Sequence, residues 1–574
     1  MIGLSTYWTR KPVTRRGVLR GVSLAAGGLA AIGLAGCRGA ATQQSSSPTS
    51  KSNTPLDPTK GKQGGKIVIQ QYGDPGGGLE LIKIRNPGTY QFAGFTHDGL
   101  LELRNGTPAH SGFDWEPQPN LAQGMPEQPD SQTYVFKLRP AKFHNGLAMT
   151  SEDVRYSYEL YAFGKDSAWK NDWPWLDKVD APDPQTVVVK TKFPFADGLQ
   201  AMAARYSGMI LNKQHQESPD AEKKLVGTGP FLFVEYRPPV LSSYKRNPEY
   251  HRQPYPYFDE IEFLENSDVE KKIADFAAHQ VQMTYYFPPA ERDRVKKARP
   301  DAQYWTYPRG SDALIMRTDK PPFNDKRVRQ ALSMAIDRKA LSQAVAQGEG
   351  EPDQTLSIAG QFWGFRKPKD LGAAAKYWNY DPQAAKQLLQ AAGVTLPMKF
   401  EVLHWNATVV GQQFVDNITL IEAQWRNAGI ADVKDGEQTF GQASQTTGIG
   451  NYSDAYWATN TVGYNMEAIG LSLRSTWFSP AEGIKGSPTL NTGYVNNSQL
   501  SALLEKQIGQ LNRDERVQTF RQIEDIFAEE QYRIEGVTTS YNFFGDPSVR
   551  NMQTPVNASN GAYPWVKYWW FDKA

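Results

Sequence analysis

The chain has 574 residues, with 63 Lys and Arg against 61 Asp and Glu, so its formal net charge is only +2. This balance excludes the broad basic surface that nucleic-acid binding requires. A single cysteine, Cys37, also excludes an intramolecular disulfide, so packing must supply the stability of the folded chain.

The N-terminal segment has the three parts of an export signal. Arg15 and Arg16 precede an uncharged apolar run, 22–34, and the small residues Ala35 and Gly36 follow it. The run is shorter than the roughly 20 apolar residues that span a bilayer. We therefore predict a cleaved signal over residues 1–36. The alternative is a buried first helix with an inert thiol.

Two short motifs refine this prediction. "TRRGVLR" resembles the twin-arginine export motif, and "LAGC" resembles the lipobox of bacterial lipoproteins. The second resemblance implies that Cys37 becomes the lipidated first residue of the mature protein. The following segment, up to residue 65, is rich in Ser, Thr, Pro and Gly, so we predict that residues 37–65 form an unstructured tether.

Strands and helices are predicted to alternate along the remaining chain, which indicates an α/β protein of two to four domains. The strands are expected where β-branched and aromatic residues concentrate. The expected strands are Lys66–Gln70, Tyr134–Arg139, Thr186–Thr191, Phe231–Tyr236, Ile261–Leu264, Ala313–Arg317 and Met398–His404.

Capping residues mark two helices in this pattern. Thr150 is a suitable N-cap for residues 151–163, with Asp153 placed to complete a capping box. Asp381 caps a second helix, and Gly393 marks its end. Residues 500–511 and 514–527 are amphipathic and predict two more helices.

The segment 324–348 predicts two consecutive helices. Asn324 is the expected cap of the first, and Asp337 is placed to start the second. An apolar stripe is formed by Val328, Leu332 and Ile336, while Arg327, Arg329 and Arg338 lie off this stripe, which favours a solvated basic face over ligand contact.

"GTGPF" and "KFHNG" predict turns. Gly227 and Gly229 are expected to adopt positive φ before a strand that starts near Pro230. His144, in the second motif, is expected to be structural, because no second metal-ligand residue follows at a suitable spacing.

Enzyme motifs are missing from the sequence. The histidines form no HExxH pattern, and neither a GxSxG elbow nor a phosphate-binding GxxxxGK[ST] loop occurs. We therefore expect a protein that is not an enzyme and needs no cofactor or metal. An exported hydrolase is the alternative.

Three segments, 130–159, 226–263 and 321–341, resemble signature blocks of the family 5 extracellular solute-binding proteins, the dipeptide-, oligopeptide- and nickel-binding receptors of ABC importers. Further similar blocks follow in the order found in that family, and together they extend from about Gly64 to Glu535. These blocks are 380–393, 418–430 and 492–530.

This resemblance implies a two-lobed fold of the periplasmic-binding-protein type (type II, with an extra subdomain). Lobe 1 is expected to comprise residues 66–305 and the C-terminal return 536–574, and lobe 2 residues 306–535. A ligand would bind in the cleft between the lobes, which close by a hinge motion and then dock on the permease of an ABC importer. The protein would be a monomer held on the outer face of the cell membrane, or in the periplasm, by its lipid anchor.

The resemblance also implies ligand contacts. Trp457 matches a tryptophan of the peptide-binding relatives, and Asn460 stands where those relatives have an aspartate. Tyr72, Trp363 and Trp405 are added because aromatic side chains beside glycines or polar residues suit a binding cleft. The neutral Asn460 leaves three ligand classes open, namely a peptide, an oligosaccharide and a metal chelate such as nickel.

Overall fold

A computed structural model describes most of the chain beyond the N-terminal segment. The described residues are 58–71, 78–83, 87–103, 116–203, 208–238, 240–266, 268–285, 287–308, 312–350, 366–407, 411–447, 450–458, 470, 473–474, 477, 491, 493–537, 540–552 and 563–572. The predicted signal and tether, with Arg15, Arg16 and Cys37, lie outside these residues.

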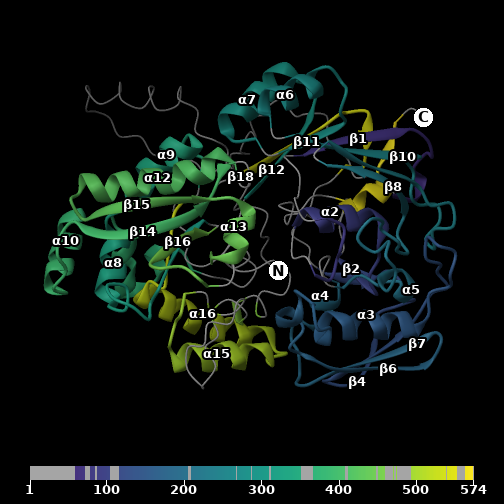
Figure 1. Ribbon diagram of the computed structural model, residues 1–574, viewed down its shortest axis with the longest axis horizontal. Coiled ribbons are helices and arrows are strands. Elements are labelled where there is room, and N and C mark those ends of the chain that lie inside the picture. Colours follow the sequence, from purple (N-terminus) through teal and green to yellow (C-terminus); the bar gives the residue numbers. More distant parts are fainter. Residues whose placement is uncertain are drawn as a thin grey trace, which may run out of the picture. The chain divides into compact units, whose positions relative to one another are not determined.

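The larger sheet has seven strands among the described residues, in the order β12-β18-β11-β1-β10-β9-β8 (Figure 1). Strand β1 lies at its centre and runs parallel to both β10 and β11, while the outer pairs are antiparallel. The strands are β1 (Lys66–Gln71), β8 (Phe231–Arg237), β9 (Leu241–Arg246), β10 (Glu260–Glu265), β11 (Met283–Tyr285), β12 (Gln303–Pro308) and β18 (Ser540–Gly545).

An antiparallel sheet of four strands, in the order β4-β5-β7-β6, shares one hydrophobic cluster with the larger sheet. Two short strand pairs, β2-β3 and β19-β20, complete this part of the molecule, which we call lobe 1. The strands are β4 (Glu127–Asp130), β5 (Thr133–Lys137), β6 (Leu176–Asp183), β7 (Thr186–Thr191), β2 (Leu101–Leu103), β3 (Pro117–Pro119), β19 (Val549–Arg550) and β20 (Trp570–Phe571).

A mixed five-stranded sheet, in the order β15-β14-β16-β13-β17, forms the centre of the other part, which we call lobe 2. Strand β14 is parallel to β15 and β16, whereas β13 is antiparallel to β16 and β17. The strands are β13 (Ala313–Met316), β14 (Met398–Trp405), β15 (Ala431–Gln438), β16 (Ala455–Ala458) and β17 (Arg533–Glu535).

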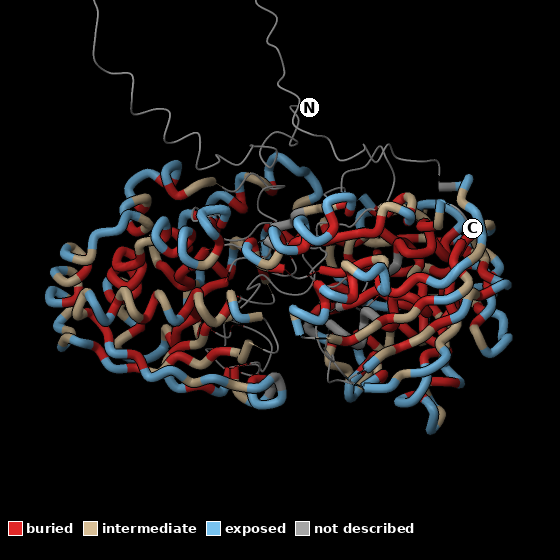
Figure 2. The backbone as a smooth tube through the Cα atoms, turned by 90° about the horizontal axis from the view of Figure 1, so that it is seen from above, coloured by how far each residue is buried: buried red, intermediate tan, exposed pale blue. Residues whose placement is uncertain are grey.

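Helices pack around each sheet, and buried segments run through the interior of both lobes (Figure 2). The α-helices of lobe 1 are α2 (Pro87–Thr96), α3 (Ser151–Phe163), α4 (Gly198–Met202), α5 (Lys213–Gln216), α6 (Val269–Ala277) and α7 (Pro289–Ala298). Those of lobe 2 are α8 (Lys326–Met334), α9 (Arg338–Ala346), α10 (Pro382–Ala391), α12 (Gln412–Asn427), α13 (Phe440–Gln445), α15 (Ser498–Ile508) and α16 (Arg513–Glu530). Short 3-10 helices are η2 (Pro58–Lys60), η3 (Lys170–Asp172), η5 (Pro368–Asp370), η6 (Gly372–Trp378) and η10 (Tyr563–Tyr568).

The predicted helix starts are largely confirmed. The Thr150 amide donates to Asp153 Oδ2 over 2.8 Å, as a capping box requires. The carboxylates of Asp381 and Asp337 accept from amides of the first turns of α10 and α9. The predicted cap Asn324 is wrong by one residue, since Asp325 caps α8 by accepting from the amide of Arg327.

Two further sequence interpretations need correction. Arg329 and Arg338 are buried rather than solvated, because Arg329 pairs with Glu530 at 2.9 Å and Arg338 donates to the carbonyl of Glu535 at 3.0 Å. Neither Gly227 nor Gly229 has positive φ. Gly229 is needed for close approach instead, since a Cβ there would lie 2.7 Å from the amide nitrogen of His97.

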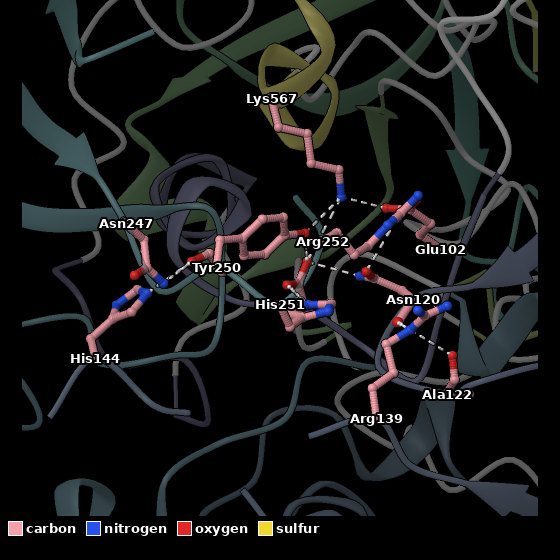
Figure 3. A network of polar contacts seen from close by, with 12 residues as sticks. Glu102, Asn120, Ala122, Arg139, His144, Asn247, Tyr250, His251, Arg252 and Lys567 are labelled. Carbon is pink, nitrogen blue, oxygen red and sulfur yellow. Dashed lines mark hydrogen bonds and ion pairs between the residues drawn. The ribbon is translucent and has the colours of Figure 1, made fainter. Parts of the chain in front are cut away.

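A buried network of charges anchors the C-terminal segment in lobe 1 (Figure 3). Lys567, in η10, pairs with Glu102 at 2.6 Å, and Lys567 itself is 1% exposed. Arg252 pairs with the same carboxylate at 2.5 Å, and His251 contacts Asp98 at 2.9 Å. Because burying an unpaired charge is costly, these contacts hold a segment from the end of the chain against residues near its beginning.

The pKa values within this network follow from its charges. The ammonium of Lys567 and the guanidinium of Arg252 lower the pKa of Glu102 to about 2, although burial opposes this shift. Lys567 and His251 likewise hold the pKa of Asp98 well below its usual value. Both carboxylates are therefore ionised at neutral pH.

We expect Lys567→Met to destabilise lobe 1 by about 3–5 kcal/mol, because Glu102 and Asp98 would lose a buried cation. Urea unfolding followed by tryptophan fluorescence measures this loss. The matched control is Lys297→Met on the exposed surface of α7, which should leave the midpoint unchanged. Equal midpoints for the two variants would contradict a stabilising role for the network.

The same network predicts a loss of stability in acid. Its contribution is fully present above the ordinary Glu pKa of 4.5 and is lost as the pH falls through 4.5 toward about 2, because Glu102 takes up a proton in the unfolded chain while it is still ionised in the folded one. The lost stability is about 3 kcal/mol for this one group. Urea midpoints measured from neutral to acidic pH should fall less steeply in Lys567→Met than in the unchanged protein.

Candidate functional site

The two sheets are joined by two neighbouring chain segments. One runs from the end of β12 at Pro308 to the start of β13 at Ala313, and the other from the end of β17 at Glu535 to the start of β18 at Ser540. Pro308 pairs with Ser540, and Ala313 pairs with Glu535. A pair of short adjacent connections of this kind is the covalent arrangement about which two lobes can rotate.

Trp457 lies against the second of these connections. A Cβ on Gly536 would lie 2.6 Å from the Trp457 ring, so only glycine allows this approach. Trp457 is 1% exposed, and its ring centroid lies 6.3 Å from that of Phe414. Among the described residues, the indole nitrogen of Trp457 has no hydrogen-bond partner. The predicted contact of Trp457 with a ligand stays a prediction.

Trp405 lies at the same edge of the sheet in lobe 2. It is the last residue of β14 and is half-buried, and the preceding His404 lies opposite Trp457 in the parallel strand β16. Carboxyl ends of parallel strands meet at one edge of a sheet, where α/β proteins commonly bind ligands. Trp405 and Trp457 therefore lie near the same strand ends but on opposite faces of the sheet, because His404, and not Trp405, is in register with Trp457.

Three predicted contacts lie outside the described residues. They are Tyr72, Trp363 and Asn460. Tyr72 directly follows β1, and Asn460 comes two residues after β16, so both follow parallel strands in the sequence. Their contacts with a ligand stay predictions, as does that of Trp363.

A buried histidine fixes the backbone at the end of β14. His404 Nε2 lies 2.6 Å from Asp435 Oδ1, and His404 Nδ1 lies 2.8 Å from the carbonyl oxygen of Trp405. Burial, with the nearby charge of Asp435, raises the pKa of Glu422 on α12 to about 7. Sequence reasoning missed this group, because Glu422 sits in an ordinary amphipathic pattern and meets Asp435 only through the packing of α12 on β15.

A second buried pair lies where β17 meets the connection between the lobes. Arg533 Nε lies 2.5 Å from Glu535 Oε1, and both side chains are 1% exposed. Arg338 from α9 also donates to the Glu535 carbonyl. The alternation of Arg and Glu in "YRIEG" could have indicated an ion pair between Arg533 and Glu535. The sequence alone does not indicate that both charges are buried.

Within the described residues, no group of three or more His, Cys, Asp and Glu side chains is arranged to hold a metal ion. No helix in the described part of the chain combines the length and apolar composition needed to cross a bilayer. The features that point to a function are the paired connections and the aromatic edge of lobe 2, by which we mean the ends of β14 and β16 that carry Trp405 and Trp457.

Comparison with curated proteins finds bacterial binding proteins as relatives of this chain. A putative ABC transporter peptide-binding protein of Brucella ovis is 28% identical over 290 residues, which cover 48% of this chain and 51% of the relative. The match thus spans about half the length of that curated relative. Heme-binding protein A of Haemophilus influenzae is 25% identical over 468 residues, covering 75% of this chain and 79% of the relative.

Solved structures show the same fold. The binding protein AgaA of A. tumefaciens R10, in complex with agropinic acid, superimposes with a TM-score of 0.75 at 22% identity and covers 89% of this chain and 99% of its own. DppA of Helicobacter pylori, in complex with the peptide STSA, also gives 0.75, at 18% identity and with the same coverage. The two-lobed fold predicted from the sequence is confirmed.

The sequence profile described as "Bacterial extracellular solute-binding proteins, family 5 Middle" matches residues 116–467, which is more than half of the chain. These residues include the four-stranded sheet of lobe 1, both strands of the first connection and the aromatic edge of lobe 2. The chain therefore belongs to the family 5 bacterial extracellular solute-binding proteins.

Proposed function

We propose that this protein is the substrate-binding component of an ABC importer, which captures a peptide or another polar solute between its lobes and delivers it to the permease. The observation that carries this proposal is the pair of adjacent connections between two separate sheets, in a chain of family 5. Capture by closure requires the ligand to favour the closed state over the open one.

The ligand-binding residues in this proposal are Trp405 and Trp457, with Tyr72, Trp363 and Asn460. Aromatic side chains stack on the flat apolar face of a sugar or of a peptide side chain, and side-chain amides form hydrogen bonds to the polar groups of the ligand. Asn460 gives up the charge-assisted bond that a carboxylate makes to a peptide amino terminus. An oligosaccharide and a metal chelate therefore remain alternative ligands of the same site.

The lobe limits are part of the proposal. Lobe 1 comprises residues 66–305 and 536–574, and lobe 2 residues 306–535. The hydrogen-bonded pairing of β12 with β18 supports a C-terminal return into lobe 1. The protein acts as a monomer, without cofactor or catalytic activity.

Export and anchoring complete the proposal. Residues 1–36 direct export, with Arg15 and Arg16 as its twin-arginine pair, and Cys37 carries the lipid that holds the protein at the membrane. Residues 37–65 then form the tether that lets the two lobes reach the permease. The "LAGC" motif and the polar composition after it support this arrangement.

The ligand is identified by mass spectrometry of small molecules released from protein purified without refolding. Calorimetry with the identified compound should show binding without product formation. We expect Trp405→Ala to weaken binding about tenfold, because a stacking contact is worth about 0.5–1.5 kcal/mol beyond its buried area. The control is Trp378→Ala in η6, since Trp378 is also half-buried but lies outside the strand ends. Sustained turnover of the compound would contradict a binding function.

Cys37→Ala tests the anchor. In cells, the unchanged protein should sediment with the membrane fraction, whereas the variant should be released, because the thiol that carries the lipid is gone. Ligand affinity should stay the same in both. A variant that still sediments with the membrane would show that another segment anchors the protein.

A further inference from the structure

A second contact between the lobes lies away from their connections in the sequence. The amide of Ala196, in the segment between β7 and α4, donates to the carbonyl of Ile508 at the end of α15 over 2.8 Å. Ile508 is 1% exposed and belongs to the hydrophobic cluster of lobe 1, although Leu500 and Leu504 of the same helix belong to a cluster of lobe 2. The end of α15 therefore inserts into lobe 1, beside α4 (Figure 1).

An ion pair adjoins this inserted residue. Arg516, near the start of α16, donates to both oxygens of Asp197, over 2.6 Å and 2.7 Å. Each side chain is 2% exposed. The two residues are 319 positions apart, and Arg516 is carried by a helix whose Phe520 packs in lobe 2. The pair therefore exists only while this face of lobe 1 touches lobe 2.

The surroundings complete the hydrogen bonding of both charges. Gln507 Oε1 accepts from Arg516 Nη2 at 2.9 Å, and the amide of Gly470 donates to Asp197 Oδ2 at 3.1 Å. Gln507 Nε2 in turn donates to the carbonyl of Gly470 at 3.0 Å. A Cβ on Gly470 would overlap both Gln507 and Arg516, so the site is built around a residue without a side chain.

A different kind of contact joins the lobes elsewhere. Arg292 of α7 pairs with Glu349, just after α9, at 2.9 Å, but the Glu349 side chain is 39% exposed. Water competes for such a pair in either state, so it discriminates weakly between separated and joined lobes. The side chains of Asp197 and Arg516 are buried when the lobes meet and exposed to water when they part. The free energy of this pair therefore depends on the separation of the lobes.

We propose that Asp197, Arg516 and the inserted Ile508 form a latch that holds the lobes together and sets the fraction of closed protein before any ligand binds. This inference rests on the proposed capture by lobe closure and adds to it the residues that regulate closure. The apparent affinity for a ligand scales with the fraction of protein in the binding-competent state, so the latch tunes affinity from outside the ligand contacts.

The test measures the distance between the lobes without any ligand. Fluorophores are attached to Lys178→Cys in lobe 1 and Lys434→Cys in lobe 2, both at exposed positions, in protein carrying Cys37→Ser. Single-molecule energy transfer then reports the populations with short and long distances. The unchanged latch should give mainly the short distance.

Arg516→Met should raise the ratio of open to closed molecules roughly 100-fold, because only opening can hydrate the uncompensated Asp197. Gly470→Ala should act in the same direction without removing a charge. The double variant Asp197→Asn with Arg516→Met should be less open than Arg516→Met alone, since no charge is left buried. Arg521→Met, on the exposed side of α16, is the control and should not change the distance.

Circular dichroism establishes that each variant is folded, and Asp197→Asn decides the test if Arg516→Met does not fold. Identical distance distributions in the unchanged protein, Asp197→Asn and Gly470→Ala would overturn the latch, even if thermal stability fell. Because no ligand is used, this failure is distinct from failure of the proposed function. If the proposed function fails, the variants would still open as expected, but the purified protein would retain no solute and would bind none.

Discussion

The double passage of the chain between two sheets is the constraint on which the rest of the structure depends. The chain leaves lobe 1 after β12, builds lobe 2, and returns through β17 and β18. Lobe 1 is consequently assembled from both ends of the folded chain, and its central sheet is complete only when β18 lies between β11 and β12. Lobe 1 therefore cannot finish folding as an uninterrupted stretch of sequence, whereas the sheet of lobe 2 is built from the single stretch between the two connections. The two connections lie side by side because the chain must leave lobe 1 and return to it.

Buried charges occur where distant segments must meet. Lys567 joins Glu102 across 465 positions, and Arg516 joins Asp197 across 319. A buried pair contributes little net stability over an apolar contact, but leaving one of its members alone costs several kcal/mol. Such pairs therefore penalise wrong docking of the C-terminal segment or of the two lobes more than they strengthen the correct arrangement.

The difference between these two pairs is where they lie. The network around Lys567 lies within lobe 1 and makes its contacts regardless of the position of lobe 2. The pair between Asp197 and Arg516 spans the lobes, so the same physical interaction that stabilises the fold in one place can respond to conformation in the other. The aromatic edge formed by Trp405 and Trp457 lies in lobe 2, and Trp457 packs against Gly536, so that edge is in direct contact with a connection that hinge motion would use.

The sequence by itself determined the features that depend on neighbouring residues. Caps at Thr150, Asp337 and Asp381 were predictable, because a capping side chain reaches only the first turn of its own helix. The blocks similar to family 5 likewise gave the fold, which its relatives share. The cap of α8 was misplaced by one residue because Asn324 and Asp325 are both good caps and adjacent.

Tertiary structure alone decided the burial of Arg329 and Arg338, the close approach at Gly229, and the pairing of Asp197 with Arg516. In each case the partner lies far away in the sequence. Periodicity places an arginine off the apolar stripe of its helix, but it does not say whether water or a second element covers that face. Tertiary packing, within a lobe or between the two lobes, supplies the covering element. That element also supplies the carboxylate or carbonyl that offsets the free-energy cost of burying a guanidinium.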